Sequence, residues 1–163
     1  MNKQEAIEQM DLLNKEMEKL RKIIEEPDSK IWRPEFDEEF YFISDKGTIS
    51  DDTWYDTDAD KSKFALNNVF KTIEEAEFEF EKQLVEAELR ICALENNDEV
   101  DWNDEGSDKY YIEYNYKTDT MEYDCYSSYQ AQGAIHFTSE EIIERAIDQI
   151  GEDRIKKYIF GIE

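Results

Sequence analysis

Residues 110–126 read YYIEYNYKTDTMEYDCY, and this stretch decides the fold class. Apolar and aromatic side chains at 110, 112, 114 and 116 alternate with those of Tyr111, Glu113 and Asn115. After a polar turn at 117–120, the alternation continues with Met121, Tyr123 and Cys125. A period of two is the mark of a strand with one buried face. The stretch therefore predicts an antiparallel hairpin.

A second hairpin is predicted upstream, at residues 40–50. Phe40 to Ile43 and Thr48 to Ser50 flank Asp45-Lys46-Gly47, and glycine is the residue that such turns favour. We expect an Asp-rich loop from Asp51 to Asp60 after it, and then another extended piece from Phe64 to Phe70.

Two helices are predicted by Thr-x-x-Glu patterns, which form capping boxes at helix N-termini. The pair Thr72 and Glu75 opens a helix to about Glu95, and the pair Thr138 and Glu141 opens a final helix whose first part ends at Gly151. Helical spacing places one buried stripe on the first helix, at Ile73, Ala76, Phe80, Leu84, Ala87, Ile91 and Leu94. Antiparallel hairpins with two packed helices make the predicted fold class α+β.

The order of hairpin, acidic loop, extended piece, capping box and helix occurs twice, in residues 27–97 and 98–163. The segment 135–141 (IHFTSEE) aligns with 69–75 (VFKTIEE) when the threonines are matched. Two explanations are open: a duplication, or the convergence of strand-to-helix junctions on the same cap.

The sequence predicts a separate helix with a heptad pattern over residues 1–26 and an α+β domain over 27–163. Apolar residues recur at spacings of three and four on one seam, at Ala6, Met10, Leu13, Met17, Leu20 and Ile24. Pro27 ends the pattern because proline disfavours helical geometry in the residue before it. This helix either forms a homodimer through Met10, Leu13, Met17, Leu20 and Ile24 or folds back on its own domain, since Ile7, Leu12 and Ile23 widen the stripe.

Negative charge dominates the composition. The 163 residues hold 43 Asp and Glu against 19 Lys and Arg, a net charge of −24. Self-repulsion at this charge destabilises a compact fold, which suggests that the negative field has a use. The chain is nevertheless expected to fold, because 9 Phe, 10 Tyr and 3 Trp are too many for a disordered protein. No apolar run suits a membrane span and the N-terminus lacks a secretory pattern, so we expect a cytoplasmic protein.

The charge is uneven along the chain, with ten Asp and Glu against two Lys in residues 98–130. On the helix after Thr72, glutamates recur every seven residues and form a row with Glu95. The candidate residues for binding a basic partner lie in two acidic loops and on this row: Asp51, Asp52, Asp56, Asp58, Asp60, Glu74, Glu77, Glu81, Glu88, Asp98, Glu99, Asp101, Asp104, Glu105 and Asp108.

Catalytic and cofactor motifs are not found in the sequence. Asp56, Asp58 and Asp60 begin like a calcium loop, but Lys61 stands at the glycine position and Asn67 at the bidentate position. His136, the single histidine, has no nucleophile signature near it, and no phosphate loop exists. We therefore expect no enzyme activity, no metal and no cofactor, and the negative field disfavours direct nucleic-acid binding.

Three motifs carry a resemblance to a known group. Trp32-Arg33-Pro34, Tyr41-Phe42-Ile43 with Gly47 and Ile49, and the run 68–76 (NVFKTIEEA) are similar to small acidic uncharacterised proteins of phages and prophages of low-GC Gram-positive bacteria. The resemblance covers about residues 30–80. It implies a phage setting, in which proteins of this size and acidity are often inhibitors of host defence, including anti-CRISPR and anti-restriction proteins.

Two hypotheses of function follow. In the first, the protein is a non-enzymatic phage inhibitor that occupies the basic nucleic-acid channel of a host nuclease with a DNA-mimic-like acidic face, in the host cytoplasm. In the second, it is a phage structural or adaptor module that dimerises through the N-terminal helix and binds partners with the tyrosine-rich segment 110–129.

Overall fold

The computed structural model describes residues 9–10, 13–17 and 31–162, and the chain divides into two compact units, Met1–Glu35 and Phe36–Glu163. In the first unit, residues 9–10 and 13–17 are helical. Met10, Leu13 and Met17 of the heptad seam are exposed by 63%, 58% and 53%. The seam positions Leu20 and Ile24 and the expected helix end at Pro27 lie outside the described residues.

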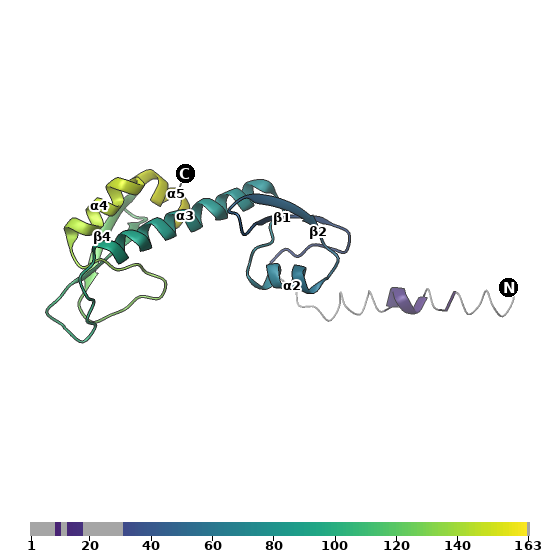
Figure 1. The fold of residues 1–163 in the computed structure, drawn as a ribbon, viewed down its shortest axis with the longest axis horizontal. Coiled ribbons are helices and arrows are strands. Elements are labelled where there is room, and N and C mark those ends of the chain that lie inside the picture. The colour runs from purple at the N-terminus through teal and green to yellow at the C-terminus, as the bar shows by residue number, and fades with distance from the viewer. Residues whose placement is uncertain (1–8, 11–12, 18–30, 163) are drawn as a thin grey trace. The chain divides into compact units, whose positions relative to one another are not determined.

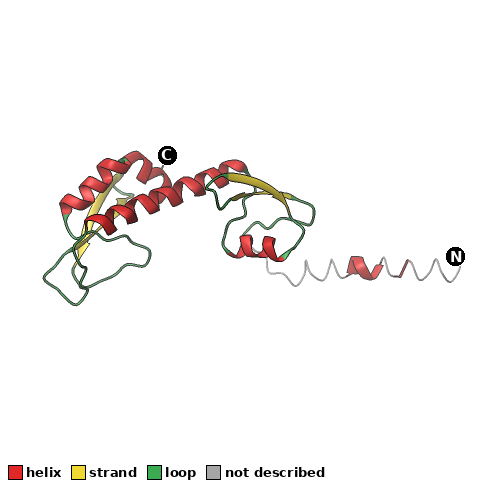
Figure 2. Ribbon diagram, in the orientation of Figure 1, coloured by secondary structure: helices red, strands yellow, loops and turns green. Residues whose placement is uncertain are grey.

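The second unit contains the mixed helices and strands expected of an α+β fold (Figures 1 and 2). Its elements are, in order, β1 (Glu39–Ile43), β2 (Ile49–Thr53), α2 (Asp58–Ala65), α3 (Ile73–Asn96), β3 (Lys109–Asn115), β4 (Thr120–Tyr126), α4 (Glu140–Ile150) and α5 (Glu152–Phe160). The two predicted hairpins are confirmed as separate antiparallel sheets, β1 with β2 and β3 with β4. Within the described ranges, no helix is both long and apolar enough to span a bilayer.

An aromatic cluster holds the first hairpin to α2. Phe40 and Trp54 are buried, with ring centroids 5.9 Å apart, and Trp54 lies 6.2 Å from Phe64. The expectation of a loop over 51–60 and an extended piece over 64–70 is wrong for most of these residues, because β2 continues to Thr53 and α2 occupies 58–65. The cap of α2 is a Thr57 and Asp60 box, in which aspartate takes the usual place of glutamate.

The buried face of α3 differs from the predicted single stripe. Ala76, Val85, Leu89, Cys92 and Ala93 are buried, whereas Ile91 and Leu94 are exposed by 52% and 79%. At 3.6 residues per turn, Ala76 and Leu89 point about 140° apart around the helix axis. The helix packs first against β1 and β2 and further along against α4 and α5, so its two halves bury different faces (Figure 1).

The larger core lies between α3, α4, α5 and the second hairpin. Its buried members include Val85, Leu89, Phe137, Ile143 and Ile155, and Tyr110, Ile112, Met121 and Tyr123 of the sheet pack against it. Gly151 separates α4 from α5 as predicted, with a positive φ of 96° that other residues rarely adopt.

The two strand-to-helix junctions share one local geometry. Tyr41 and Phe70 exchange two main-chain hydrogen bonds of 2.9 Å, and Tyr110 and Phe137 exchange two of 2.8 Å. In each case the helix cap follows two residues later, at Thr72 and at Ser139. The cap predicted at Thr138 is therefore displaced by one residue, because the Thr138 hydroxyl instead accepts a hydrogen bond from the Asp98 amide.

Candidate functional site

The acidic loop 98–108 is fixed to the domain at its start. Asn97, the C-cap of α3, donates from its amide nitrogen to the His136 carbonyl at 2.8 Å and accepts from the Thr138 amide at 3.1 Å. The Asp98 amide then donates to the Thr138 hydroxyl at 3.1 Å. These bonds join the end of α3 to the segment that leads into α4, so the loop leaves from a defined position.

The loop is fixed from within by Lys109, which is only 1% exposed. Its ammonium donates to the main-chain carbonyls of Asp104, at 2.8 Å, and Ser127, at 2.7 Å, and lies 5.7 Å from the centre of the Trp102 ring. Carbonyl dipoles and an aromatic face thus solvate this buried cation. The ammonium holds the middle of the loop to the end of β4 by main-chain contacts, which leaves the loop carboxylates outside.

Six exposed acidic residues occupy this loop: Asp98, Glu99, Asp101, Asp104, Glu105 and Asp108. Asp101 and Asp104 shape it, because their side chains accept from the amides of Asn103 and Gly106 at 2.9 Å. In the part of the chain that the structure describes, none of the six forms an ion pair. The loop therefore presents six exposed carboxylates on a backbone held by hydrogen bonds to the domain.

Two side chains of β4 have raised pKa values, and Asp108 of the loop contributes to one of them. Burial raises the pKa of the Cys125 thiol, and the charges of Asp108, Asp124 and Glu140 raise it further. The pKa of Tyr123 is raised to about 12, first by its hydrogen bond to Glu144 and then by burial. Both groups stay neutral at physiological pH, so they add nothing to the charge and Cys125 is a poor nucleophile.

The first acidic segment, 51–60, is largely satisfied within the domain. Asp60 is 4% exposed and accepts from the amides of Tyr55 and Thr57, so it is a capping residue and cannot belong to a partner-binding surface. Asp52 pairs with Lys63 at 2.7 Å, and Asp56 pairs with Lys61 at 3.2 Å. Asp51 and Asp58 remain exposed.

The glutamate row on α3 is interrupted at its centre. Arg154 of α5 pairs with Glu88 at 2.6 Å and with Glu81 at 3.3 Å. Glu74 and Glu77 near the start of the helix, and Glu95 near its end, are exposed. The continuous row expected from the heptad spacing is therefore divided in two.

The candidate residues consequently fall into separate groups at the two ends of α3. Glu74 and Glu77 lie at its N-terminal end, while loop 98–108 follows its C-terminal end. The 24 residues of the helix span about 36 Å at 1.5 Å per residue. Loop 98–108 is the group with the most unpaired charge.

His136 lies beneath the loop, 9% exposed, with its ring 4.9 Å from Trp102 and 6.2 Å from Tyr111. Burial lowers its pKa, and its Nε2 atom is buried without a hydrogen-bond partner. Among the residues that the structure covers, no three His, Cys, Asp or Glu side chains come together as a metal site would require.

Sequence patterns did not reveal the two cations that organise this surface. Lys109 reads as an ordinary strand residue, and the partners of Arg154 are 66 and 73 residues away in the chain. A lysine next to a tryptophan-containing acidic loop is the one local signal that could have suggested a buried ammonium. Comparison with known proteins gives no further guide, since no family model, curated protein or solved structure matches the chain.

Proposed function

We propose that this protein is a non-enzymatic phage inhibitor of a host defence nuclease, of the anti-CRISPR or anti-restriction type, which acts in the host cytoplasm. Loop 98–108 would occupy a basic surface that otherwise binds nucleic acid. The observation that carries the proposal is the set of six exposed carboxylates without ion pairs, held by the buried ammonium of Lys109. The phage setting is supported by the resemblance of residues 30–80.

The electrostatics favour a basic protein as partner. Unpaired surface carboxylates repel one another, and a cationic surface relieves that repulsion on binding. A fixed loop also loses little conformational freedom when it binds, which favours affinity. Attraction of this kind accelerates encounter and weakens with salt, because the Debye length falls from about 10 Å at 0.1 M to about 3 Å at 1 M.

The test is affinity capture from host lysate at low and high salt, followed by identification of the captured proteins. The variant Asp98→Asn/Glu99→Gln/Glu105→Gln removes three charges without touching the turns made by Asp101 and Asp104. A matched control, Glu141→Gln/Asp148→Asn/Asp153→Asn, removes three exposed charges from α4 and α5.

We expect capture of a nucleic-acid-binding nuclease that duplex DNA displaces and that the loop variant loses while the control retains it. Capture that resists salt and DNA, or that both triple variants weaken equally, contradicts the proposal. Inhibition of the captured nuclease by the purified protein completes the test.

A second function, a dimeric adaptor, is supported by the exposure of Met10, Leu13 and Met17 in the N-terminal helix. Tyr116 and Tyr129 are also exposed, by 72% and 73%, and tyrosine is enriched in protein interfaces. Sedimentation of the wild type and of Leu13→Lys/Met17→Lys discriminates: a dimer that the variant abolishes favours the adaptor, and a monomer at all concentrations excludes the coiled-coil dimer.

A further inference from the structure

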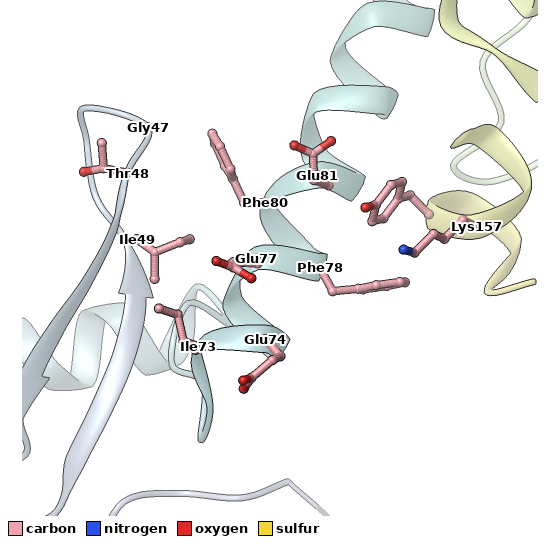
Figure 3. A pocket seen from close by; sticks show the side chains of 11 residues that line it. Gly47, Thr48, Ile49, Ile73, Glu74, Glu77, Phe78, Phe80, Glu81 and Lys157 are labelled. Atoms are coloured by element: carbon pink, nitrogen blue, oxygen red, sulfur yellow. The ribbon is translucent and has the colours of Figure 1, made fainter. Parts of the chain in front are cut away.

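A groove of about 780 Å³ lies between the first hairpin, the start of α3 and α5 (Figure 3). The hairpin contributes Gly47 and Thr48 from its turn and Ile49 from the start of β2, and α5 contributes Lys157 and Tyr158. Ligand sites in proteins commonly have volumes of about 300 to 1,000 Å³, so the groove can accept several side chains of a partner. It is distinct from loop 98–108, which follows the other end of α3.

The floor of the groove is apolar and aromatic. Ile73 and Phe78 of α3 are exposed by 41% and 39%, large fractions for side chains of this type. Phe80 is turned toward the hairpin, where a Cβ atom at Gly47 would lie 3.6 Å from its ring, and Phe78 is turned toward α5. The Phe78 and Tyr158 rings lie 5.2 Å apart and close the floor on that side.

Carboxylates line the same groove. Glu74 and Glu77 are exposed and form no ion pair within the described ranges, while Glu81 is paired with Arg154. Their two charges exceed the half positive charge, about +0.5, that the helix dipole places at the start of α3. Among the described residues that line the groove, the one cation is Lys157, which lies 5.2 Å from the Tyr158 ring at the α5 side. The hairpin side is therefore both apolar and negative.

We propose that this groove binds a basic amphipathic segment of a partner protein, with apolar side chains on Ile73, Phe78 and Phe80 and Lys or Arg side chains beside Glu74 and Glu77. Charge complementarity selects this occupant, because an acidic segment would be repelled and an uncharged apolar one would leave the carboxylates unpaired. Helix-in-groove recognition of this kind anchors apolar residues at helical spacing. The proposal goes beyond the inhibitor function, since it uses none of the residues of loop 98–108.

The test uses labelled peptides of about 15 residues, the length at which isolated helices become marginally stable. One peptide has Leu at helical spacing and Lys elsewhere; a second replaces Lys with Glu, and a third replaces Leu with Ser. We expect only the first to bind and to shift the amide resonances of Gly47, Thr48 and Ile49.

Variants locate the binding. Glu74→Gln/Glu77→Gln should weaken the first peptide about tenfold through the loss of two charges, whereas Asp98→Asn/Glu99→Gln, with the same change of charge, should leave it unchanged. Phe78→Ala should weaken it as well, and the glutamine variant keeps the test valid if the alanine variant does not fold.

Three results would overturn the proposal. Equal weakening by both charge variants means non-specific attraction, and equal binding of the third peptide means that no apolar anchor is used. Self-association of the protein that Phe78→Ala abolishes means that a second copy of the chain is the occupant. The inhibitor function is tested by the capture experiment with Asp98→Asn/Glu99→Gln/Glu105→Gln, and groove binding is tested by the peptides. Failure of one proposal therefore does not decide the other.

Discussion

The ammonium of Lys109 donates a hydrogen bond to the main-chain carbonyl of Ser127 at 2.7 Å, and this bond joins the first residue of β3 to the residue just beyond β4. A second bond from the same ammonium holds the Asp104 carbonyl in the acidic loop. One buried cation thus connects the edge of a sheet to the loop that carries the most unpaired negative charge.

Replacement of Lys109 with Met should destabilise the domain by about 2 kcal/mol, because two part-buried main-chain carbonyls lose a charged hydrogen-bond donor. Backbone amides in loop 98–108 should also exchange faster with solvent. Urea unfolding and hydrogen exchange measure these effects. Lys117→Met, at an exposed position between β3 and β4, is the control and should change stability by less than about 0.5 kcal/mol. Equal effects of the two substitutions would contradict a special role for Lys109.

Local patterns in the sequence predicted the elements whose causes are local. The Thr72 and Glu75 capping box sets the start of α3, the glycine at 47 sets the first turn, and Gly151 divides the last helix. Period-two alternation predicted the hairpin at 110–126, and the Asp45-Lys46-Gly47 turn between two extended segments predicted the one at 40–50. Each of these features depends on residues within a few positions of one another, so the sequence of that segment is enough to predict it.

Features that depend on distant contacts were not predictable. The buried face of α3 changes sides between Ala76 and Leu89 because different elements pack on the two halves. The prediction of a continuous glutamate row on α3 was wrong for a similar reason, because Arg154, more than 60 residues away in the chain, pairs with two of its members. The acidic run 51–60 predicts a surface charge at Asp60. In the structure this carboxylate is buried and accepts hydrogen bonds from the main-chain amides of Tyr55 and Thr57.

Asp60 and Asp58 lie two residues apart and should differ sharply in their effect on stability. Asp60→Asn weakens two hydrogen bonds from main-chain amides to a buried carboxylate, and should cost about 1 to 2 kcal/mol at neutral pH. Asp58→Asn changes an exposed first-turn charge of α2 and should cost at most about 0.5 kcal/mol. Urea unfolding of the two variants decides this, and a larger loss for Asp58→Asn would show that the cap is not formed by Asp60.

Arg154→Gln should destabilise the domain by about 1 kcal/mol, because Glu81 and Glu88 lose their shared partner on the half-exposed surface of α3. The effect should shrink as salt is added, since screening weakens both the pair and the repulsion that its loss exposes. The control is Arg90→Gln, which replaces an exposed arginine of α3. A salt-independent loss would indicate that Arg154 acts through the packing of its alkyl chain.

The single histidine provides a pH test, because His136→Phe removes its titration and leaves every carboxylate in place. Burial lowers the pKa of His136 from its ordinary value of 6.5, so the unfolded chain takes up this proton at a higher pH than the folded protein. The stability that this difference confers is complete above 6.5 and is lost as the pH falls below it, by up to about 1.4 kcal/mol per pH unit. Proton NMR should therefore give a His136 pKa below 6.5 in the folded protein. His136→Phe, which keeps a planar ring against Trp102 and Tyr111, should lose less stability than the wild type between pH 7 and about pH 5. A measured pKa at or above 6.5, or parallel stability curves for the two proteins, would mean that the ring is solvated or has a partner at Nε2.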